Sequence, residues 1–300
     1  MRHVALAALL LSVPGCAHAT GSRPPRPGTQ PFASAFVTED PGLWSLVWSD
    51  EFDGPSGTAP DAAKWSYDVG GDGWGNGELE TYCAPDSAAP CDSAAPNAYQ
   101  DGQGHLVISA NRDAAGRWTS ARLKTFGLKT IEYGRVEARM RLPEGAGLWP
   151  AFWMLGSNIQ SAGWPACGEI DIMENVPGDV PGGLGVDAVK ATLHGPGYSG
   201  ADGYGGALRL PNGGRVDEFH VYGARWSPGR VEFYVDDPSQ IYFVASRDGI
   251  PPGTAWAFDH PFFMIMNLAV GGAWPKDPTP RTPNPAKMLV DYVRVYRSAP

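Results

Sequence analysis

Turn-forming residues constrain the fold of this chain more than any other feature. Glycine occurs 39 times and proline 29 times among the 300 residues, and no stretch combines a sustained helical repeat of apolar residues with helix caps. Short apolar segments lie between these turn formers, and the 11 tryptophans and 11 tyrosines are residues enriched in strands. This pattern predicts an all-β sandwich of short strands.

Alternation of charge supports this prediction. In 135–141 every second residue is charged, as in an antiparallel strand with one solvated face, and polar and apolar residues alternate similarly in 230–235. Without a linker, charge run or internal repeat after about residue 43, we expect one domain over 43–300. The expected strands are 46–49, 105–110, 119–125, 131–141, 149–155, 168–174, 188–194, 219–226, 231–236, 262–268 and 289–296. Long Gly/Pro-rich connections, where binding residues usually lie, are expected at 70–77, 177–187, 195–217 and 271–287.

One of these strands carries three acids. Residues 168–175 read G-E-I-D-I-M-E-N and place Glu169, Asp171 and Glu174 within one short apolar run. Side chains alternate across a strand, so Glu169 and Asp171 share a face, whereas regular alternation sends Glu174 to the other face. One extra residue near Ile172 and Met173, a β-bulge, would return Glu174 to the side of Glu169.

With that bulge, the acids are placed as the hydrolysis of a glycosidic bond requires. The α-carbons of Glu169 and Glu174 would lie roughly 13 Å apart, and inward-leaning side chains could close to the ~5–5.5 Å carboxyl separation of a retaining glycosidase. Asp171 between them raises at least one pKa, and a carboxyl protonated near neutral pH can act as a general acid. We therefore assign Glu169 as nucleophile, Asp171 as electrostatic helper and Glu174 as acid/base. A solvated acidic face and a cation site are the alternatives.

Aromatic side chains surround the acidic segment. The apolar faces of sugar rings stack on indole, whose N–H can also donate a hydrogen bond. Alternation puts Trp149 and Trp153 on one face of their strand and Phe152 on the other, so some of these rings belong to the core. His194, which ends the strand A-T-L-H, either reaches the acids or is structural. The ring candidates for sugar contact are Trp149, Trp164 and Trp274, with Trp74 in a further Gly-rich loop.

Charge narrows the class of ligand. The formal net charge is −9, and Lys and Arg do not cluster along the chain. This argues against nucleic acid or an anionic membrane surface as a partner. A neutral ligand bound by aromatic stacking fits better.

The first 19 residues indicate export. Arg2 and His3 precede an apolar run, 4–13, that is too short to span a bilayer and reads as a signal peptide. Cleavage could follow Ala17-His18-Ala19, or V-P-G-C could act as a lipobox in which Cys16 is lipidated. Either predicts a protein that is extracellular or in the outer cell envelope, without a membrane span, and residues 20–42 follow as a Pro-rich tether.

The remaining cysteines agree with export. Cys83 and Cys91 flank a Pro/Ala/Ser loop and could form a disulfide in an oxidising compartment. Cys167 precedes Glu169 by two residues, but no His/Asn pair that would activate a catalytic thiol is evident around it. A buried, unreactive cysteine is the favoured interpretation.

The acidic octapeptide resembles the signature of glycoside hydrolase family 16, in the bulged E-x-D-x-x-E form of its laminarinase branch rather than the unbulged form of lichenases. The resemblance implies a β-jelly roll of two antiparallel sheets with a concave substrate cleft, and retaining hydrolysis of β-glucans. It extends in the family's order over W-S-D-E-F-D-G (48–54), G-W-G-N-G-E-L-E-T-Y (73–82), T-S-A-R-L-K-T (119–125), Y-G-R-V-E-A-R (133–139), G-L-W-P-A-F-W-M-L-G (147–156), T-L-H-G (192–195), N-L-A-V-G-G-A-W-P (267–275) and V-D-Y-V-R-V-Y (290–296).

The same resemblance implies further site residues. It suggests a structural calcium on the convex side, with Glu51, Asp291 and a backbone carbonyl near 102–104 as ligands, and no cofactor for catalysis. The stretch 83–103 and the segments 177–187 and 196–217 are longer than the branch leads us to expect, which leaves linkage preference open. The implied cleft residues are Asn76, Glu78, Arg122, Trp149, Trp153, His194, Asn267 and Trp274.

We therefore expect a monomeric endo-β-1,3-glucanase that acts with net retention on laminarin-like polysaccharide or oligosaccharide, and also on mixed β-1,3/1,4-glucan. The alternatives are a hydrolase of the same fold with another substrate, such as an agarase or carrageenase, and a transglycosylase. A non-catalytic glucan-binding protein is a further alternative, but such relatives lose the acids that this chain retains.

Overall fold

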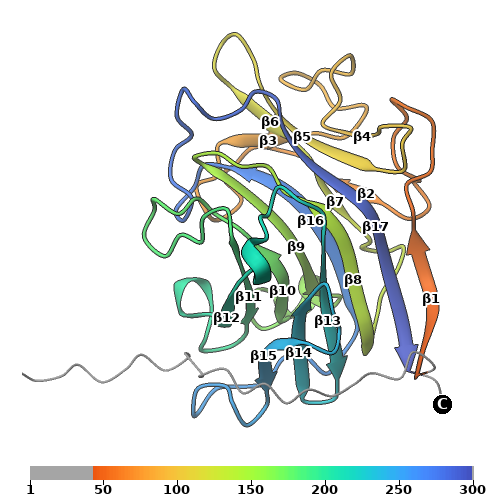
Figure 1. Cartoon of the computed structure of the whole chain (residues 1–300), viewed down its shortest axis with the longest axis vertical. Helices are drawn as coiled ribbons and strands as arrows, with labels where there is room; N and C mark the ends of the chain where they lie inside the picture. The colour runs from red at the N-terminus through yellow and green to blue at the C-terminus, as the bar shows by residue number, and fades with distance from the viewer. Residues whose placement is uncertain (1–42, 299–300) are drawn as a thin grey trace, which may run out of the picture.

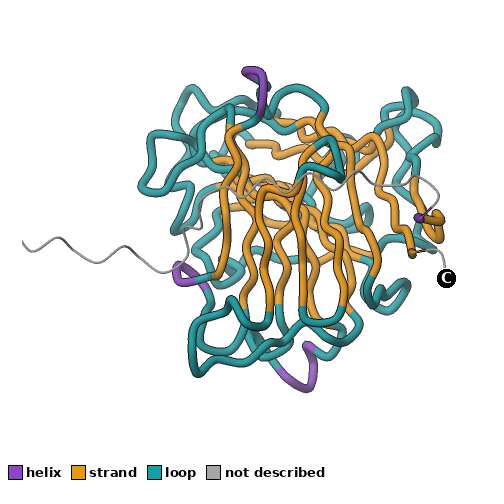
Figure 2. The backbone as a smooth tube through the Cα atoms, turned by 60° about the horizontal axis from the view of Figure 1, so that its bottom comes forward, coloured by secondary structure: helices purple, strands orange, loops and turns teal. Residues whose placement is uncertain are grey.

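The computed structural model describes residues 43–298. The expected signal peptide (1–19), the lipobox at Cys16 and the Pro-rich tether (20–42) lie outside the described residues. Within 43–298, none of the helices has the length and apolar character needed to cross a bilayer. Strands and loops make up nearly all of the described chain, as Figure 2 shows.

Two β-sheets lie face to face (Figure 1). The ten-stranded outer sheet has the order β15-β14-β13-β8-β17-β5-β6-β3, and β1 and β4 pair with β17 and β5 respectively. Its strands are β1 (Trp44–Asp50), β3 (Glu80–Tyr82), β4 (Ala98–Gln100), β5 (Leu106–Arg112), β6 (Trp118–Ser120), β8 (Gly134–Arg141), β13 (His220–Ser227), β14 (Arg230–Val235), β15 (Ile241–Ser246) and β17 (Ala286–Ser298).

The seven-stranded inner sheet has the order β12-β11-β10-β9-β16-β7-β2. Among the described residues, the short helical turns α1 (Ile159–Ala162), η2 (Gly200–Asp202) and η3 (Pro211–Gly213) lie in the connections. The strands of this sheet are β2 (Ser66–Asp68), β7 (Arg122–Lys124), β9 (Leu148–Gly156), β10 (Glu169–Glu174), β11 (Ala188–His194), β12 (Tyr204–Arg209) and β16 (Phe262–Val270).

The architecture confirms the predicted β-sandwich, although the sequence did not predict five of its strands, β2, β3, β4, β12 and β15. All eleven expected segments form strands, and 119–125 divides at Ala121 into β6 in one sheet and β7 in the other. Pairing is antiparallel except between β3 and β6, which run parallel. Parallel neighbours need a long connection, and here residues 83–117, including the loop between Cys83 and Cys91, separate the two strands.

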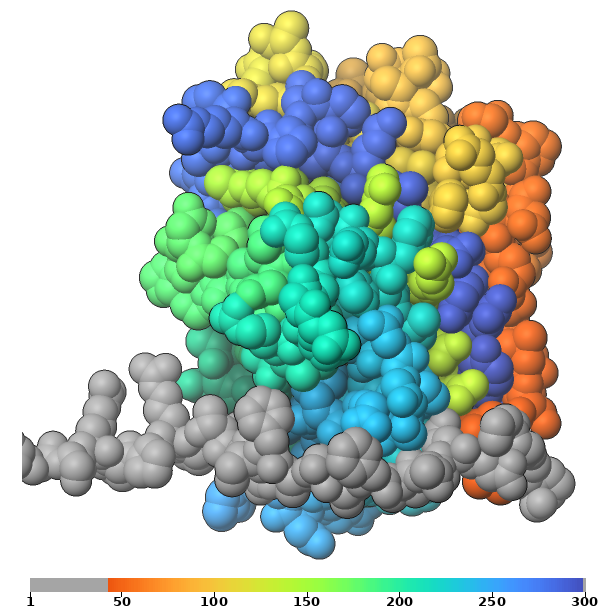
Figure 3. Space-filling view, in the orientation of Figure 1, coloured from red at the N-terminus to blue at the C-terminus, as the bar shows by residue number. Residues whose placement is uncertain are grey.

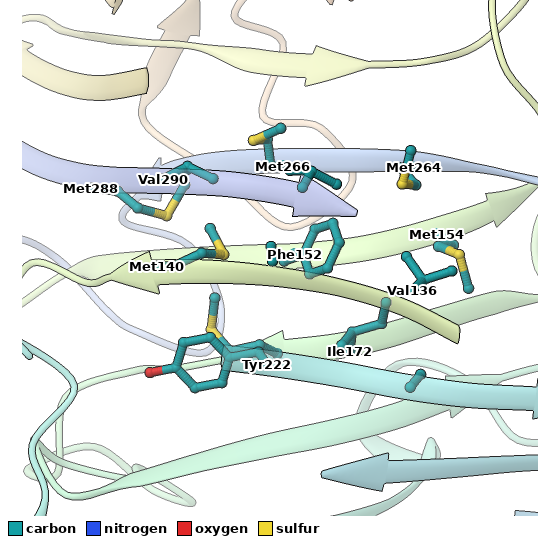
Figure 4. Packing of buried hydrophobic residues seen from close by; sticks show 14 of the residues in the cluster. Val136, Met140, Phe152, Met154, Ile172, Tyr222, Met264, Met266, Met288 and Val290 are labelled. Atoms are coloured by element: carbon teal, nitrogen blue, oxygen red, sulfur yellow. The ribbon is translucent and has the colours of Figure 1, made fainter. Parts of the chain in front are cut away.

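An apolar core fills the space between the sheets (Figure 4). Large apolar side chains from both sheets are 0–2% exposed there, and complete burial of each contributes roughly 1.5–3 kcal/mol. This packing fixes one face of each inner strand, so the opposite face, here called the site face, presents the remaining side chains. The labelled core residues are Val136, Met140, Tyr222, Met288 and Val290 from the outer sheet and Phe152, Met154, Ile172, Met264 and Met266 from the inner sheet.

The cysteines divide as the sequence suggested. Cys83 and Cys91 are joined by a disulfide across the loop that follows β3. Cys167 is free and fully buried. Burial raises the pKa of its thiol to about 11, so it stays protonated at neutral pH and is a poor nucleophile.

Candidate active site

The predicted bulge is present in β10. Against β9, Asp171 pairs with Trp153 and Met173 pairs with Phe152, so Ile172 is the extra residue. Ile172 and Met173 are both buried in the core. Two consecutive core-facing residues shift the alternation by one position, and Glu174 returns to the site face with Asp171.

Glu169 and Asp171 share polar neighbours at one end of this site. The indole Nε1–H of Trp164 donates to Glu169 Oε2 at 3.1 Å. His194 Nε2 lies 3.6 Å from Glu169 Oε1 and 3.0 Å from Asp171 Oδ2. His194 therefore reaches the acids from β11, as one of the two interpretations of the sequence required, and the half-exposed Trp164 ring lies beside them.

Glu174 has both carboxyl oxygens engaged. Trp149 Nε1–H donates to Oε1 at 3.1 Å, and the Thr192 hydroxyl donates to Oε2 at 3.2 Å. Trp149 in turn meets Trp274 edge to face, with ring centroids 5.5 Å apart. Trp274 Nε1–H donates to the carbonyl of Gly182, which joins the segments 177–187 and 271–285 that Figure 3 shows side by side.

Burial perturbs the titration of all three acids. Loss of hydration raises the pKa of Glu169, and the charge of Asp171 raises it further. Burial likewise raises the pKa of Asp171, opposed by Lys190. The pKa of Glu174 is raised to about 7, by burial first and then by Asp171. The cluster therefore retains at least one proton near neutral pH, as general acid catalysis requires.

A second polar network lies further along the site face. Glu78 accepts hydrogen bonds from Asn76 Nδ2 at 2.8 Å, from the Tyr82 hydroxyl at 3.0 Å and from Arg122 Nη2 at 3.2 Å. Asn267 Nδ2 donates to the Tyr82 oxygen at 3.1 Å. Tyr82 thus connects a buried ion pair to Asn267, and these contacts fix the orientation of the predicted site residues.

Aromatic rings enclose Arg122. Its guanidinium carbon lies 4.7 Å from the centroid of the Trp74 ring, 4.5 Å from that of Tyr82 and 5.6 Å from that of Trp153. A delocalised cation stacks favourably on such faces. Trp153 also donates from Nε1 to Asn267 Oδ1 at 2.8 Å, so one indole contacts both the cation and the amide.

Strand register joins the two groups into rows across the inner sheet. One row runs Arg122, Asn267, Ala151, Glu174 and Lys190 over β7, β16, β9, β10 and β11. A neighbouring row contains Ile265, Trp153, Asp171 and Thr192, and a third pairs Glu169 with His194. Directly paired residues point to the same side of a sheet, so residues far apart in the sequence form one continuous surface.

Several members of this surface were not expected from the sequence. Thr192 and Lys190 alternate with His194 on β11, and Tyr82 and Glu80 alternate with Glu78 on and beside β3. Period-2 spacing from an already chosen residue would have identified all four. Trp149 and Trp153 share the site face and Phe152 lies in the core, as alternation predicted.

The suggested calcium ligands are held by arginines. Glu51 accepts from Arg294 through both oxygens, at 2.8 and 3.1 Å, and these bonds lower the pKa of Glu51. Asp291 accepts from Arg139 Nη1 at 2.6 Å. A calcium site needs six to eight oxygen ligands, and the arginines compete with such an ion for these two carboxylates.

Comparison with known proteins agrees with this geometry. Residues 87–294 match the model of the glycosyl hydrolases family 16. The chain is 46% identical over 263 residues to a beta-glucanase of Rhodothermus marinus, covering 85% of each protein. The laminarinase catalytic domain of Thermotoga maritima superposes with a TM-score of 0.74 at 43% identity, over 86% of this chain and 100% of that one. An endo-beta-1,3-glucanase of Pyrococcus furiosus superposes with a TM-score of 0.74 at 42% identity, and the match covers 89% of this chain and 99% of that one.

Proposed function

Because the chain belongs to the glycosyl hydrolases of family 16, we propose that it is a retaining endo-hydrolase of β-1,3-glucan, with mixed β-1,3/1,4-glucan as a further substrate. The names of its relatives, a beta-glucanase, a laminarinase and an endo-beta-1,3-glucanase, support this substrate class. The observation that carries the mechanism is the bulge at Ile172, which returns Glu174 to the face of Glu169.

In the proposed reaction Glu169 attacks the anomeric carbon and forms a covalent glycosyl-enzyme. Glu174 donates its proton to the leaving glycosidic oxygen, then accepts a proton from the water that releases the sugar. The raised pKa of Glu174 favours its protonated form before the first step. The hydrogen bonds from Trp149 and Thr192 hold its carboxyl in place during both steps.

The other site residues are assigned to binding. Asp171 and His194 lie within contact distance of each other beside Glu169 and orient its carboxylate. The rings of Trp149, Trp153, Trp164 and Trp274 stack on sugar faces. The network of Asn76, Glu78, Arg122 and Asn267 donates and accepts hydrogen bonds at sugar hydroxyls. Each assignment is a proposal that single substitutions can test.

The deciding experiment incubates the full chain with laminarin, lichenan, agarose and κ-carrageenan and follows the products by proton NMR. We expect laminarin to be cleaved internally and the first new reducing ends to be β. Glu169→Gln should abolish turnover, and Glu174→Gln should lower kcat by about 10²–10⁴-fold, both without loss of fold. An α product, or rapid hydrolysis by Glu169→Gln, would remove these roles.

We also propose that the protein is exported and works as a monomer, with residues 43–300 as its catalytic domain. The disulfide between Cys83 and Cys91 supports an oxidising compartment. Mass spectrometry of the N-terminus from the native host would distinguish cleavage after Ala19 from lipidation at Cys16.

A further inference from the structure

Three atoms that can bind a metal lie together on the site face. Glu169 Oε1, Asp171 Oδ2 and His194 Nε2 are all within 4.8 Å of one another. The nitrogen lies 3.6 Å from the first oxygen and 3.0 Å from the second. Zinc bound tetrahedrally at about 2.0–2.1 Å holds neighbouring ligand atoms about 3.3 Å apart, a value between these two separations.

Asp171 supplies an independent reason for a cation. The residue is 4% exposed, and Oδ2 accepts no hydrogen bond within the described chain; its neighbour is His194 Nε2, 3.0 Å away, which forms an ion pair with it only when the imidazole is protonated. A buried carboxylate oxygen without a donor is costly. This oxygen faces the imidazole nitrogen at 3.0 Å, where a metal ion would contact both.

The backbone holds these ligands in position before any ion arrives. Glu169 and His194 are direct register partners between β10 and β11. Gly203 packs so closely against the imidazole that an added Cβ would lie 2.5 Å from Cε1 and 2.8 Å from Nδ1. The ring therefore has little room to turn away from the two carboxylates.

We propose that Glu169, Asp171 and His194 bind one Zn²⁺ ion reversibly, with water at the fourth position, and that the bound ion blocks the site. Two carboxylates and one imidazole suit zinc, which accepts mixed nitrogen and oxygen ligands in a four-coordinate site. They are too few for Ca²⁺, which needs six to eight oxygens, or for the octahedral shell of Mg²⁺. Blocking rests on the proposed role of Glu169 as nucleophile, whereas binding does not.

The surroundings of the imidazole predict that the ion exchanges. When Nε2 binds zinc, the ring proton moves to Nδ1, and Nδ1 has no partner in the described chain. Acceptors at this position contribute about 10–100-fold in affinity in metal sites that have them. EDTA should therefore remove the ion completely, unlike a structural zinc.

The first test uses the untagged full chain and Co²⁺ as a visible probe. We expect one equivalent of Co²⁺ to produce the intense absorption bands of a tetrahedral site, and one equivalent of Zn²⁺ to displace them. Calorimetric titration with Zn²⁺ should give one site, and Ca²⁺ should give no heat. Weak octahedral bands alone, or no heat with zinc, would overturn the proposal.

Variants then locate the ion. His194→Ala and Asp171→Asn should each lower zinc affinity by about 100-fold or more, beyond what outer partners contribute. If His194→Ala does not fold, Gly203→Ala takes its place as the test. The added methyl group displaces the imidazole ring without removing a ligand, so this variant should also bind zinc more weakly. His105→Gln is the matched control, because His105 faces a single carboxylate, Asp101, at 2.8 Å. Unchanged affinity in the folded His194 variant would refute the site.

Competition separates this proposal from the proposed function. Laminaribiose should weaken zinc binding, and zinc should inhibit laminarin hydrolysis in a way that EDTA reverses. If the cobalt bands appear but laminaribiose has no effect on them, the metal site stands and the glucan assignment fails. If calorimetry shows one bound Zn²⁺ but laminarin is hydrolysed equally with and without it, the metal site stands and the blocking of the site, with the proposed role of Glu169, is refuted.

Discussion

Single side chains set the chemistry of this molecule through their hydrogen bonds and burial. Glu174 has a donor on each oxygen, whereas Asp171 has one buried oxygen that accepts no hydrogen bond from residues 43–298. Both lie on one strand, three residues apart, yet their surroundings differ because Trp149 and Thr192 come from neighbouring strands. The titration of each group therefore depends on residues far away in the sequence.

Glu174 should make stability fall as pH rises. Its pKa is about 7 in the folded chain against an ordinary value of 4.5, so between these pH values the folded state binds more protons than the unfolded state. Its contribution is complete below about pH 4.5 and is lost as pH rises through 7. The melting temperature of Glu174→Gln, measured by scanning calorimetry, should fall less between pH 5 and pH 8 than that of the wild type. Glu132→Gln, at an exposed position, is the control. If the melting temperatures of Glu174→Gln and the wild type change equally with pH, the raised pKa of Glu174 is contradicted.

Glu80 should act as a protonated acid beneath the second network. It is fully buried, Oε2 accepts the Val270 N–H at 2.7 Å, and Oε1 has no donor among the described residues. Burial and the adjacent Glu78 raise its pKa to about 8. Glu80→Gln keeps both a donor for Glu78 and an acceptor for Val270, so its stability and KM should stay near wild type. Glu80→Ala should cost about 1–3 kcal/mol for the unsatisfied groups and raise KM for laminarin.

At the scale of the strand, the bulge in β10 decides which side chains act together. Its presence was predictable because three acids with a shared task need a shared face, and E-I-D-I-M-E provides that only with one extra residue. The short strands β2, β3 and β4 were not predictable, since three residues are too few to show alternation. β12 was missed because its Y-G-G-A-L-R sequence reads as a loop, and only pairing with β11 makes it a strand.

Deletions in β10 should test this geometry directly. Removing Ile172 restores regular alternation with Glu169, Asp171 and Glu174 still on one face, so the variant should keep measurable retaining hydrolysis. The loss of a buried isoleucine should lower its stability by about 2–5 kcal/mol. Removing Ile170 instead makes Glu169 a direct neighbour of Asp171 and turns it toward the core. That matched deletion should be inactive. Equal activity of the two, measured on laminarin beside circular dichroism, would refute the role of the bulge.

At the scale of the whole molecule, the sandwich is stabilised by its own core and ion pairs. The pairs of Arg294 with Glu51 and of Arg139 with Asp291 tie strands of the outer sheet together. The resemblance to family 16 led us to expect a calcium ion here, and the sequence could not reveal that arginines reach both carboxylates first. Side-chain partners of this kind depend on register between β1, β8 and β17, which pattern alone does not specify.

Calcium should therefore have no effect on stability. The melting temperature should be the same in EDTA and in excess CaCl₂, because Arg294 occupies both oxygens of Glu51. Arg294→Ala, which frees that carboxylate, is the informative comparison, since it alone should gain any response to the ion. A rise in the melting temperature of the wild type with calcium would show that the arginines yield to it.

The row from Arg122 to Lys190 also has a fixed length. It crosses five strands spaced about 4.8 Å apart, so its ends are separated by about 19 Å, more than a single pyranose can bridge. Affinity must then accumulate ring by ring along a polymer, and catalytic efficiency should climb with each added glucose until the row is covered. The distance between hydrogen-bonded strands thereby sets the length of the shortest oligomer that the enzyme hydrolyses with full catalytic efficiency.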